Sequence, residues 1–122
     1  MRDSLAVDLT LINLESPTET REFEKGRFEL FEVGPMTLGR ASYDPGWKWS
    51  EHVGAESGES MCEVEHVGLV LSGRAAVLME DGTERVMEPG DFFYVPPGHD
   101  SWVVGDEPYV SLHVMGSSDY AA

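Results

Sequence analysis

Four side chains in this sequence have the types and spacing to bind a transition metal. Cys62 and His66 are four residues apart, so they share a face if their segment is a β-strand, in which side chains alternate between two faces. Imidazole binds zinc, iron, nickel and copper, and a thiolate favours zinc or copper further. We therefore predict a site for one divalent transition metal (zinc, iron, nickel, copper or manganese). Its ligands are drawn from His52, His66, Cys62 and His99.

Each of these side chains also has an interpretation without a metal. An inward His66 would fill its position by hydrogen bonding to a serine or a water, and Cys62 would be a small buried apolar residue. His99 would be a residue of the rim that contacts a ligand. His113, which alternates with Ser111 in an apolar run, is interpreted as structural.

A second group of side chains has the chemistry to line a ligand cavity at the mouth of a β-barrel. The predicted ligand-binding residues are His99, Ser101, Trp49 and Trp102. The aromatic rings would equally serve as the core between two sheets or as a dimer face. Phe92 and Tyr94 share one face of a predicted strand and Phe93 lies on the other, which predicts that a second sheet or subunit covers one of the two faces.

The elements that must position these residues are β-strands. Periodic and apolar runs predict strands over residues 27–33, 36–43, 47–52, 64–71, 74–80, 83–87, 91–95, 101–104 and 109–114. Turn signals separate them, and Asp81-Gly82 is the strongest, as a type I′ hairpin turn with positive φ at both central positions. We therefore predict an all-β fold in a single domain, residues 1–122.

Residues 1–26 are predicted to form an amino-terminal arm. Residues 5–14 favour a strand, and Ser16, Pro17 and Glu19 favour the start of a short helix that ends near Gly26. The strand has no obvious partner in a minimal barrel, and exposed strand edges need covering. Pairing with a second copy solves this, so we predict a homodimer.

The glycines and histidines of the first half resemble a motif of the cupin superfamily. Gly46 lies six residues before His52, where the motif has a histidine, and Gly73 ends the motif. Counting back seven residues from Gly73 places His66 at the position of the family's glutamate. The chain thus has an imidazole where the family has a carboxylate.

A second motif of the same superfamily is similar to residues 90–98, in which five residues separate Gly90 from a Pro-Pro-Gly turn. Ser101 stands where that motif has its histidine, and His99 directly follows the turn. The resemblance covers residues 36–115. It implies a double-stranded β-helix, that is, a jelly-roll barrel with these residues as its core.

The resemblance also implies chemistry in the mouth and interior of the barrel. The leading expectation is a cupin-type protein that binds a small molecule, with a divalent metal in the barrel. One alternative is a metal-dependent oxygenase or isomerase of the superfamily. The other is a non-catalytic structural or sensory dimer module, since the fold alone does not choose an activity.

Composition excludes several classes of partner. The chain of 122 residues has 23 acidic and 8 basic residues, and its net charge of −15 disfavours binding to nucleic acid or anionic membrane. Its single cysteine forms no intrachain disulfide and favours a reducing compartment, so we expect a cytoplasmic protein. The sequence contains neither a glycine-rich phosphate loop nor a Gly-x-Ser-x-Gly nucleophile motif.

Overall fold

The computed structural model describes residues 8–117 and 120, and its regular elements are nearly all β-strands, as predicted. The elements in chain order are β1 (Glu19–Phe23), β2 (Gly26–Val33), β3 (Met36–Tyr43), α1 (Trp49–His52), α2 (Gly54–Ser57), β4 (His66–Ser72), β5 (Arg74–Met79), β6 (Glu84–Met87), β7 (Phe92–Val95), β8 (His99–Val104) and β9 (Tyr109–Met115). Within this part of the chain, no helix is long and apolar enough to cross a bilayer.

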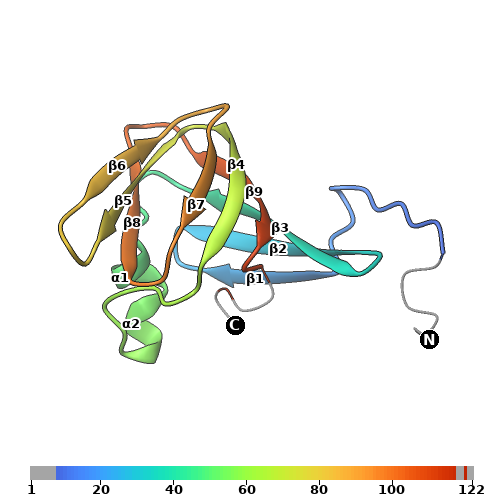
Figure 1. The fold of residues 1–122 in the computed structure, drawn as a ribbon, viewed down its shortest axis with the longest axis horizontal. Coiled ribbons are helices and arrows are strands. Elements are labelled where there is room, and N and C mark those ends of the chain that lie inside the picture. Colours follow the sequence, from blue (N-terminus) through green and yellow to red (C-terminus); the bar gives the residue numbers. More distant parts are fainter. Residues whose placement is uncertain (1–7, 118–119, 121–122) are drawn as a thin grey trace.

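Two antiparallel sheets face each other and form a jelly-roll barrel (Figure 1). The larger sheet has the strand order β1-β2-β3-β9-β4-β7, and the smaller has the order β6-β5-β8. The two short helices lie together at one end of the barrel, and the amino-terminal arm extends away from it. The barrel interior therefore lies between the inward faces of β3, β4 and β9 on one side and β5 and β8 on the other.

The strand predictions are confirmed for all segments from β2 onward except residues 47–52. Alternation was the correct signal, because inward residues such as Ala41, Val70 and Ser111 are nearly inaccessible. The segment from Trp47 to His52 alternates in the same way, but residues 49–52 form the helix α1. The side chain of Asp100 explains this, since its carboxylate accepts hydrogen bonds from the backbone N–H and hydroxyl of Ser50.

The amino-terminal arm differs from both predictions made for it. The predicted helix over residues 16–26 is wrong, because β1 pairs along its length with β2, with Glu19 opposite Leu30. Sheet pairing with a complete neighbouring strand outweighs the local capping signal here. Of the predicted strand 5–14, residues 8–14 are irregular and residues 5–7 lie outside the described part.

The hairpin at Asp81-Gly82 is present, but its turn is not type I′. Only Gly82 has positive φ, +94°, and Lys25 is the only described residue other than glycine with positive φ. The N–H of Gly82 donates to the Met79 carbonyl, and the N–H of Met79 donates to Thr83. This is the three-residue hairpin loop, in which a glycine in the left-handed region follows a type I turn.

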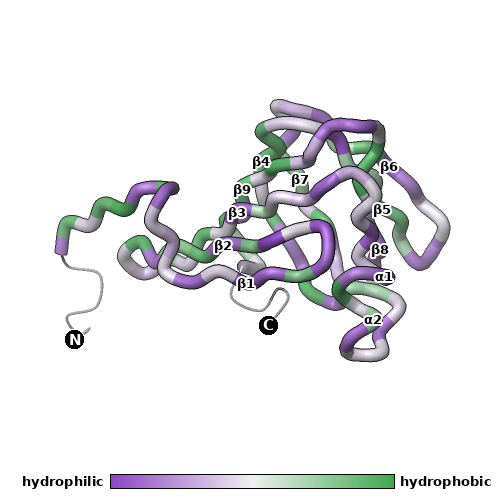
Figure 2. Tube along the Cα trace, turned by 180° about the vertical axis from the view of Figure 1, so that it is seen from behind, coloured by the Kyte–Doolittle hydropathy of each residue, from purple (hydrophilic) through white to green (hydrophobic). Residues whose placement is uncertain are grey.

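The core fills most of the barrel with aromatic side chains. Tyr43 stacks on Trp47 with ring centroids 3.8 Å apart, and Tyr109 stacks on the other side of Tyr43 at 5.9 Å. Phe28 packs against Tyr120, which follows the last strand and is buried. Figure 2 shows hydrophobic and hydrophilic residues interspersed along the strands, as expected for strands with one inward and one outward face.

Candidate functional site

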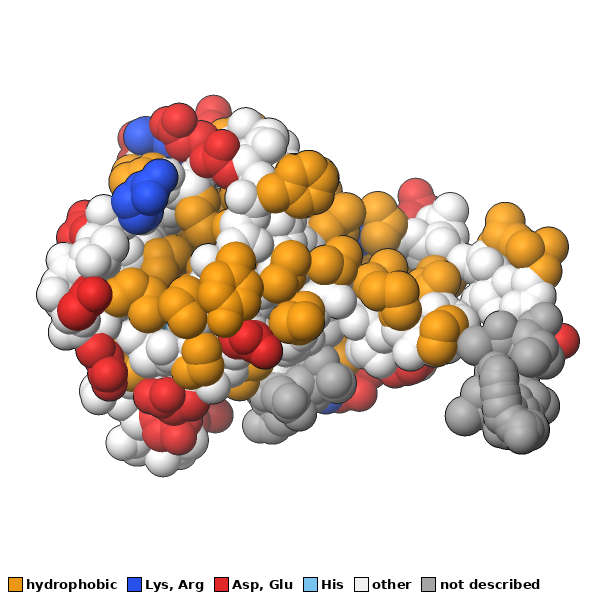
Figure 3. Space-filling view, in the orientation of Figure 1, with side chains coloured by type: hydrophobic (Ala, Val, Ile, Leu, Met, Phe, Trp, Pro, Cys, Tyr) orange, Lys and Arg blue, Asp and Glu red, His pale blue; other side chains and the backbone are white. Residues whose placement is uncertain are grey.

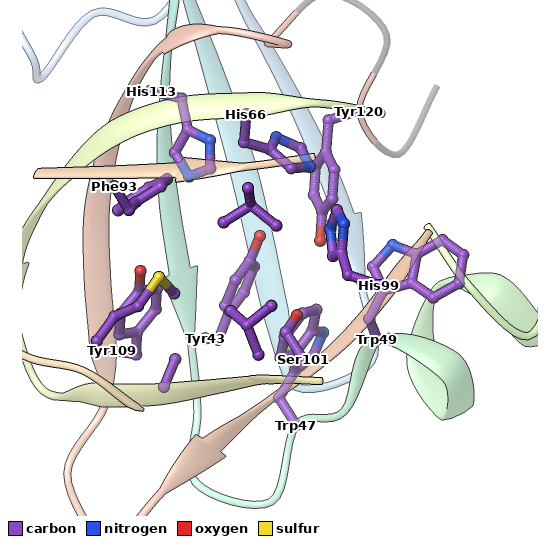
Figure 4. Close-up of a pocket in the computed structure, with 14 residues that line it drawn as sticks. Tyr43, Trp47, Trp49, His66, Phe93, His99, Ser101, Tyr109, His113 and Tyr120 are labelled. Atoms are coloured by element: carbon purple, nitrogen blue, oxygen red, sulfur yellow. The ribbon is translucent and has the colours of Figure 1, made fainter. Parts of the chain in front are cut away.

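The interior of the barrel contains a small cavity of about 40 Å³. Figure 4 shows its aromatic and imidazole rings converging from both sheets. The lining residues are Tyr43, Trp47, Trp49, His66, Ala75, Val77, Met87, Phe93, Val95, His99, Ser101, Tyr109, His113 and Tyr120. A water needs roughly 10–15 Å³ of such space, so the cavity has room for a few waters or an ion with a very small ligand.

Cys62, His66 and His99 meet at one side of this cavity. Each offers one donor atom, the three donor atoms lie within 4.8 Å of one another, and all three residues are buried. His66 is the first residue of β4 and His99 the first of β8. Cys62 is held against β8 because its N–H donates to the His99 carbonyl at 2.6 Å and its own carbonyl accepts from Gly98.

The geometry of this group fits a metal ion. The Cys62 Sγ and His66 Nε2 are 3.7 Å apart. Zinc bonds of about 2.3 Å to sulfur and about 2.0–2.1 Å to nitrogen, at a tetrahedral angle, would place two such donors about 3.6 Å apart. The His99 Nδ1 is 2.7 Å from the Pro96 carbonyl, to which it can donate a proton. That bond leaves Nε2 of His99 with a free lone pair, the tautomer that metal-binding histidines adopt.

Burial keeps this group uncharged. Burial raises the pKa of the Cys62 thiol to about 11, with smaller contributions from nearby carboxylates. Burial also lowers the pKa of His66 to about 3, helped by His113 and His99, and lowers the pKa of His99. Both imidazoles are therefore neutral and ready to act as ligands at neutral pH, whereas the thiol must lose a proton to a metal that binds.

His52 lies apart from this group. It is at the end of α1, where its Nδ1 is 3.0 Å from the backbone nitrogen of Lys48 and its Nε2 is 4.0 Å from Glu24. It lines a hollow on the outer side of the barrel, whereas His66 lines the interior cavity. The reason is that residues 49–52 are helical, so the side-chain alternation used to place His52 does not apply.

The four predicted ligand-binding residues divide between two locations. His99, Ser101 and Trp49 line the cavity. Trp102 lies on the opposite face of β8, where the Lys48 ammonium is 5.4 Å from the centroid of its ring. Adjacent residues of a strand point to opposite faces, so Ser101 and Trp102 cannot both face the interior.

His113 lines the cavity although the sequence interpretation made it structural. Its ring is 5.2 Å from the ring of His66 and perpendicular to it, and its Nε2 is 3.0 Å from the Ser111 hydroxyl. Burial lowers its pKa to about 4. The signal was the alternation of Tyr109, Ser111 and His113, which places three polar side chains on the inward face of β9.

Two of the buried imidazoles keep an unused nitrogen. The Nδ1 atoms of His66 and His113 have no hydrogen-bond partner among the described residues, and neither do the indole nitrogens of Trp47 and Trp49. Unpaired polar atoms in a core cost free energy unless a ligand or water satisfies them. These four atoms all belong to residues that line the same cavity.

A larger hollow of about 490 Å³ lies outside the cavity and shares Trp49 and Tyr120 with it. Cys62 belongs to its lining, and the Cys62 Sγ is 3.7 Å from Nε2 of His66, which lines the cavity. Its acidic lining residues are Glu22, Glu56, Glu59 and Glu63. The negative field of these carboxylates favours the approach of cations over anions.

Comparison with known proteins agrees with this architecture. A family model described as "Cupin domain" matches residues 47–115. Comparison with curated protein sequences gives no match.

Several solved structures have the same fold at low sequence identity. A Rhizobium leguminosarum protein of unknown function has a TM-score of 0.63 and 21% identity, covering 88% of this chain and 96% of its own. A sugar phosphate isomerase of the cupin superfamily from Silicibacter pomeroyi has a TM-score of 0.62 and 19% identity, with coverages of 85% and 73%. The cupin domain of Drosophila melanogaster CENP-C has a TM-score of 0.57 and 16% identity, with coverages of 88% and 85%.

Proposed function

Because this chain belongs to the cupin family, we propose that its barrel binds one zinc ion through Cys62, His66 and His99 and a small molecule beside it. The observation that carries the proposal is the convergence of three buried donor atoms within 4.8 Å. A mixed set of sulfur and nitrogen donors suits zinc, and copper is the nearest competitor. A single unpaired cysteine is typical of reducing compartments, so we propose a cytoplasmic location.

Three protein ligands leave one position of a tetrahedral zinc ion free. Catalytic zinc sites have three protein ligands and an open position, whereas structural zinc sites have four protein ligands. The free position would be filled from the adjoining cavity, whose 40 Å³ limits the bound group to a few atoms. A longer molecule would extend past Trp49 into the outer hollow of about 490 Å³. When bound, zinc would supply a Lewis acid that polarises the bound group.

Metal analysis of the purified protein tests the proposal. We expect about one zinc per chain when the protein is produced with zinc present and purified without chelator. His66→Ala and Cys62→Ala should each lower this content at least tenfold, because two remaining ligands retain the ion poorly. The matched control is His52→Ala, which removes a histidine outside the group and should leave the zinc content unchanged.

Substitution with cobalt(II) tests the identity of the ligands and the free position. A thiolate-to-cobalt absorption band should appear in the wild-type protein and in His52→Ala but not in Cys62→Ala. Azide, which has three atoms, should shift the cobalt spectrum if the free position opens into the cavity. Zinc that remains bound in both His66→Ala and Cys62→Ala would overturn the proposed site.

A metal-dependent oxygenase or isomerase is the second candidate function. The specific observation in its favour is His113, a neutral imidazole 5.2 Å from His66 that occupies the same cavity without ligating in the proposed set. An imidazole in that place has the chemistry to move a proton to or from a molecule held by the metal. Turnover by the zinc or iron form that is lost in His113→Phe, with metal content unchanged, would distinguish this candidate from simple binding.

A further inference from the structure

The outer side of the larger sheet has an unusual surface over β4, β7 and β9. Antiparallel sheets normally present polar side chains on the face that does not cover the core. Here the outward side chains of the three strands are apolar, and we call this set the outer apolar face. Its residues are Val67, Leu69, Leu71, Phe92, Tyr94, Leu112 and Val114.

Strand register brings these side chains into rows. Leu69 pairs with Phe92 on one side and with Leu112 on the other, so three large apolar side chains cross the sheet in line. Val67 pairs with Tyr94 in the next row. Figure 3 shows hydrophobic side chains running across this side of the molecule, over β7, β4 and β9.

The outer apolar face is strongly exposed to water. Phe92 is 80% exposed, Tyr94 59%, Val114 49% and Leu71 43%. A single exposed apolar side chain needs no explanation, but a contiguous row of this kind marks an interaction site. We propose that this face packs against the same face of a second copy of the chain, as a symmetric homodimer.

The distribution of charged residues favours a second copy of the chain as the partner that covers the outer apolar face. The chain has 31 residues that are Asp, Glu, Lys or Arg, 23 of them acidic, yet the segments His66–Ser72, Phe92–Val95 and Tyr109–Met115 contain none. Two molecules of net charge −15 repel each other, so they associate best through a surface from which charge is absent. A basic partner would instead be drawn to the acidic surfaces elsewhere.

The segment just before β1 is anchored on the same outer side of the larger sheet. The Arg40 guanidinium on β3, next to β9, donates to the Leu14 carbonyl at 2.9 Å. Beyond that anchor, Leu9 is 92% exposed and Leu11 84%, although both are large apolar residues. A second copy placed on the outer apolar face offers these leucines a surface to cover.

The exposed area is sufficient for a stable dimer. An aromatic side chain buries roughly 150–250 Å², so Phe92 and Tyr94 alone offer roughly 250 Å² at their exposed fractions. With the aliphatic residues of the face and the two arm leucines, the apolar surface is on the order of the 800 Å² that each partner contributes to a standard interface. Two sheets that pack face to face in this way lie about 10 Å apart.

The rim of the face is polar, as in typical interfaces. The Tyr94 hydroxyl donates to the Glu65 carboxylate at 2.8 Å, which keeps the polar end of this side chain satisfied at the edge. Its ring remains available for apolar contact. A symmetric dimer places each residue of the face opposite residues of the same set, so a single substitution enters the interface twice.

Light scattering after size exclusion tests the proposal. The wild-type chain of 13.5 kDa should have twice this mass at micromolar concentration. Phe92→Glu and, separately, Tyr94→Glu should shift the mass to that of one chain, because each places two additional negative charges in an apolar interface. The matched control is Val104→Glu, a substitution at a half-buried apolar residue on the outward face of β8 in the smaller sheet, which should leave the dimer intact.

Far-UV circular dichroism of each variant separates dissociation from unfolding. Phe92 and Tyr94 are exposed in the single chain, so both variants should keep the wild-type spectrum. If one variant unfolds, the other still decides the question. A monomeric wild-type protein, or a dimer that survives in both folded variants, would overturn the proposed interface. Neither result bears on zinc binding, which the metal content of the same samples reports separately.

Discussion

Gly68 is the position at which the structure predicts the sharpest effect of a small substitution. It lies in β4, opposite His113 of β9 and Phe93 of β7. A Cβ added there would overlap the Leu112 carbonyl oxygen and come within 2.6 Å of the Phe93 ring. The backbone oxygen belongs to a paired strand, so it can move away only if the pairing of β4 with β9 is disturbed.

The cost of Gly68→Ala follows from this overlap. Overpacking in a well-packed core typically costs 1–3 kcal/mol, so we expect a loss of roughly that size in the free energy of unfolding. At about 2.1 cal/mol/K of unfolding entropy per residue, a chain of this length should lose about 4 °C in Tm for each kcal/mol. The predicted decrease in Tm is therefore roughly 4–12 °C.

Urea unfolding followed by far-UV circular dichroism measures this loss, with Gly34→Asn as the matched control. Gly34 has φ of +60°, no atom lies within 4 Å of a Cβ added there, and asparagine tolerates this conformation. The control should stay within about 0.5 kcal/mol of wild type. An unchanged midpoint for Gly68→Ala would refute the close approach of β4 and β9, and with it the 5.2 Å separation of His66 and His113 that depends on it.

Two further predictions concern buried polar groups. Burial lowers the pKa of His113 to about 4, below its unfolded value near 6.5, so the unfolded chain binds more protons between these pH values. In metal-free protein, the contribution of neutral His113 to the free energy of unfolding should be complete above pH 6.5 and fall by roughly 3 kcal/mol as the pH approaches 4. Urea unfolding of His113→Phe should therefore show a smaller loss of stability between pH 7 and 4.5 than the wild type does. The same loss in both proteins would contradict a lowered pKa of His113. Asp100→Ala removes the acceptor for Ser50 and should cost roughly 1–3 kcal/mol and speed hydrogen exchange in α1, whereas Asp100→Asn, which retains one oxygen, should cost less. If the α1 amides of Asp100→Ala exchange as slowly as those of the wild type, Asp100 does not stabilise the helix.

The strands of the barrel could be predicted from two signals in the sequence. The alternation of apolar and polar residues indicated which side chains face the interior, as for Ala41 and Val70, and glycines indicated where the chain turns. Gly73 has φ of +73° and separates β4 from β5 as predicted. The arm could not be predicted in this way, because the pairing of β1 with β2 is a contact between segments that a local capping signal does not contain.

The candidate site was predictable only where alternation held. His66 lies on a regular strand, and its inward direction follows from its register with Val95. His52 lies in a short helix stabilised by Asp100, a residue 48 positions away in the chain, and no local pattern indicates that contact. The alternation along residues 109–114 already indicated that His113 shares a face with Ser111. A role in proton transfer became apparent only from the 5.2 Å between its ring and that of His66.

The central position of β9 has a consequence for the order in which the chain folds. This strand follows all the other described strands in the chain, yet it lies between β3 and β4 and joins the two parts of the larger sheet. During synthesis, β1 to β3 can form a local meander early, but the sheet cannot close until β9 has emerged from the ribosome. Until then, β3 and β4 each keep an unpaired edge, a state that is slow to resolve and prone to aggregation. The imidazole of His113 belongs to β9, so the side chains of the cavity come together only after β9 has been translated.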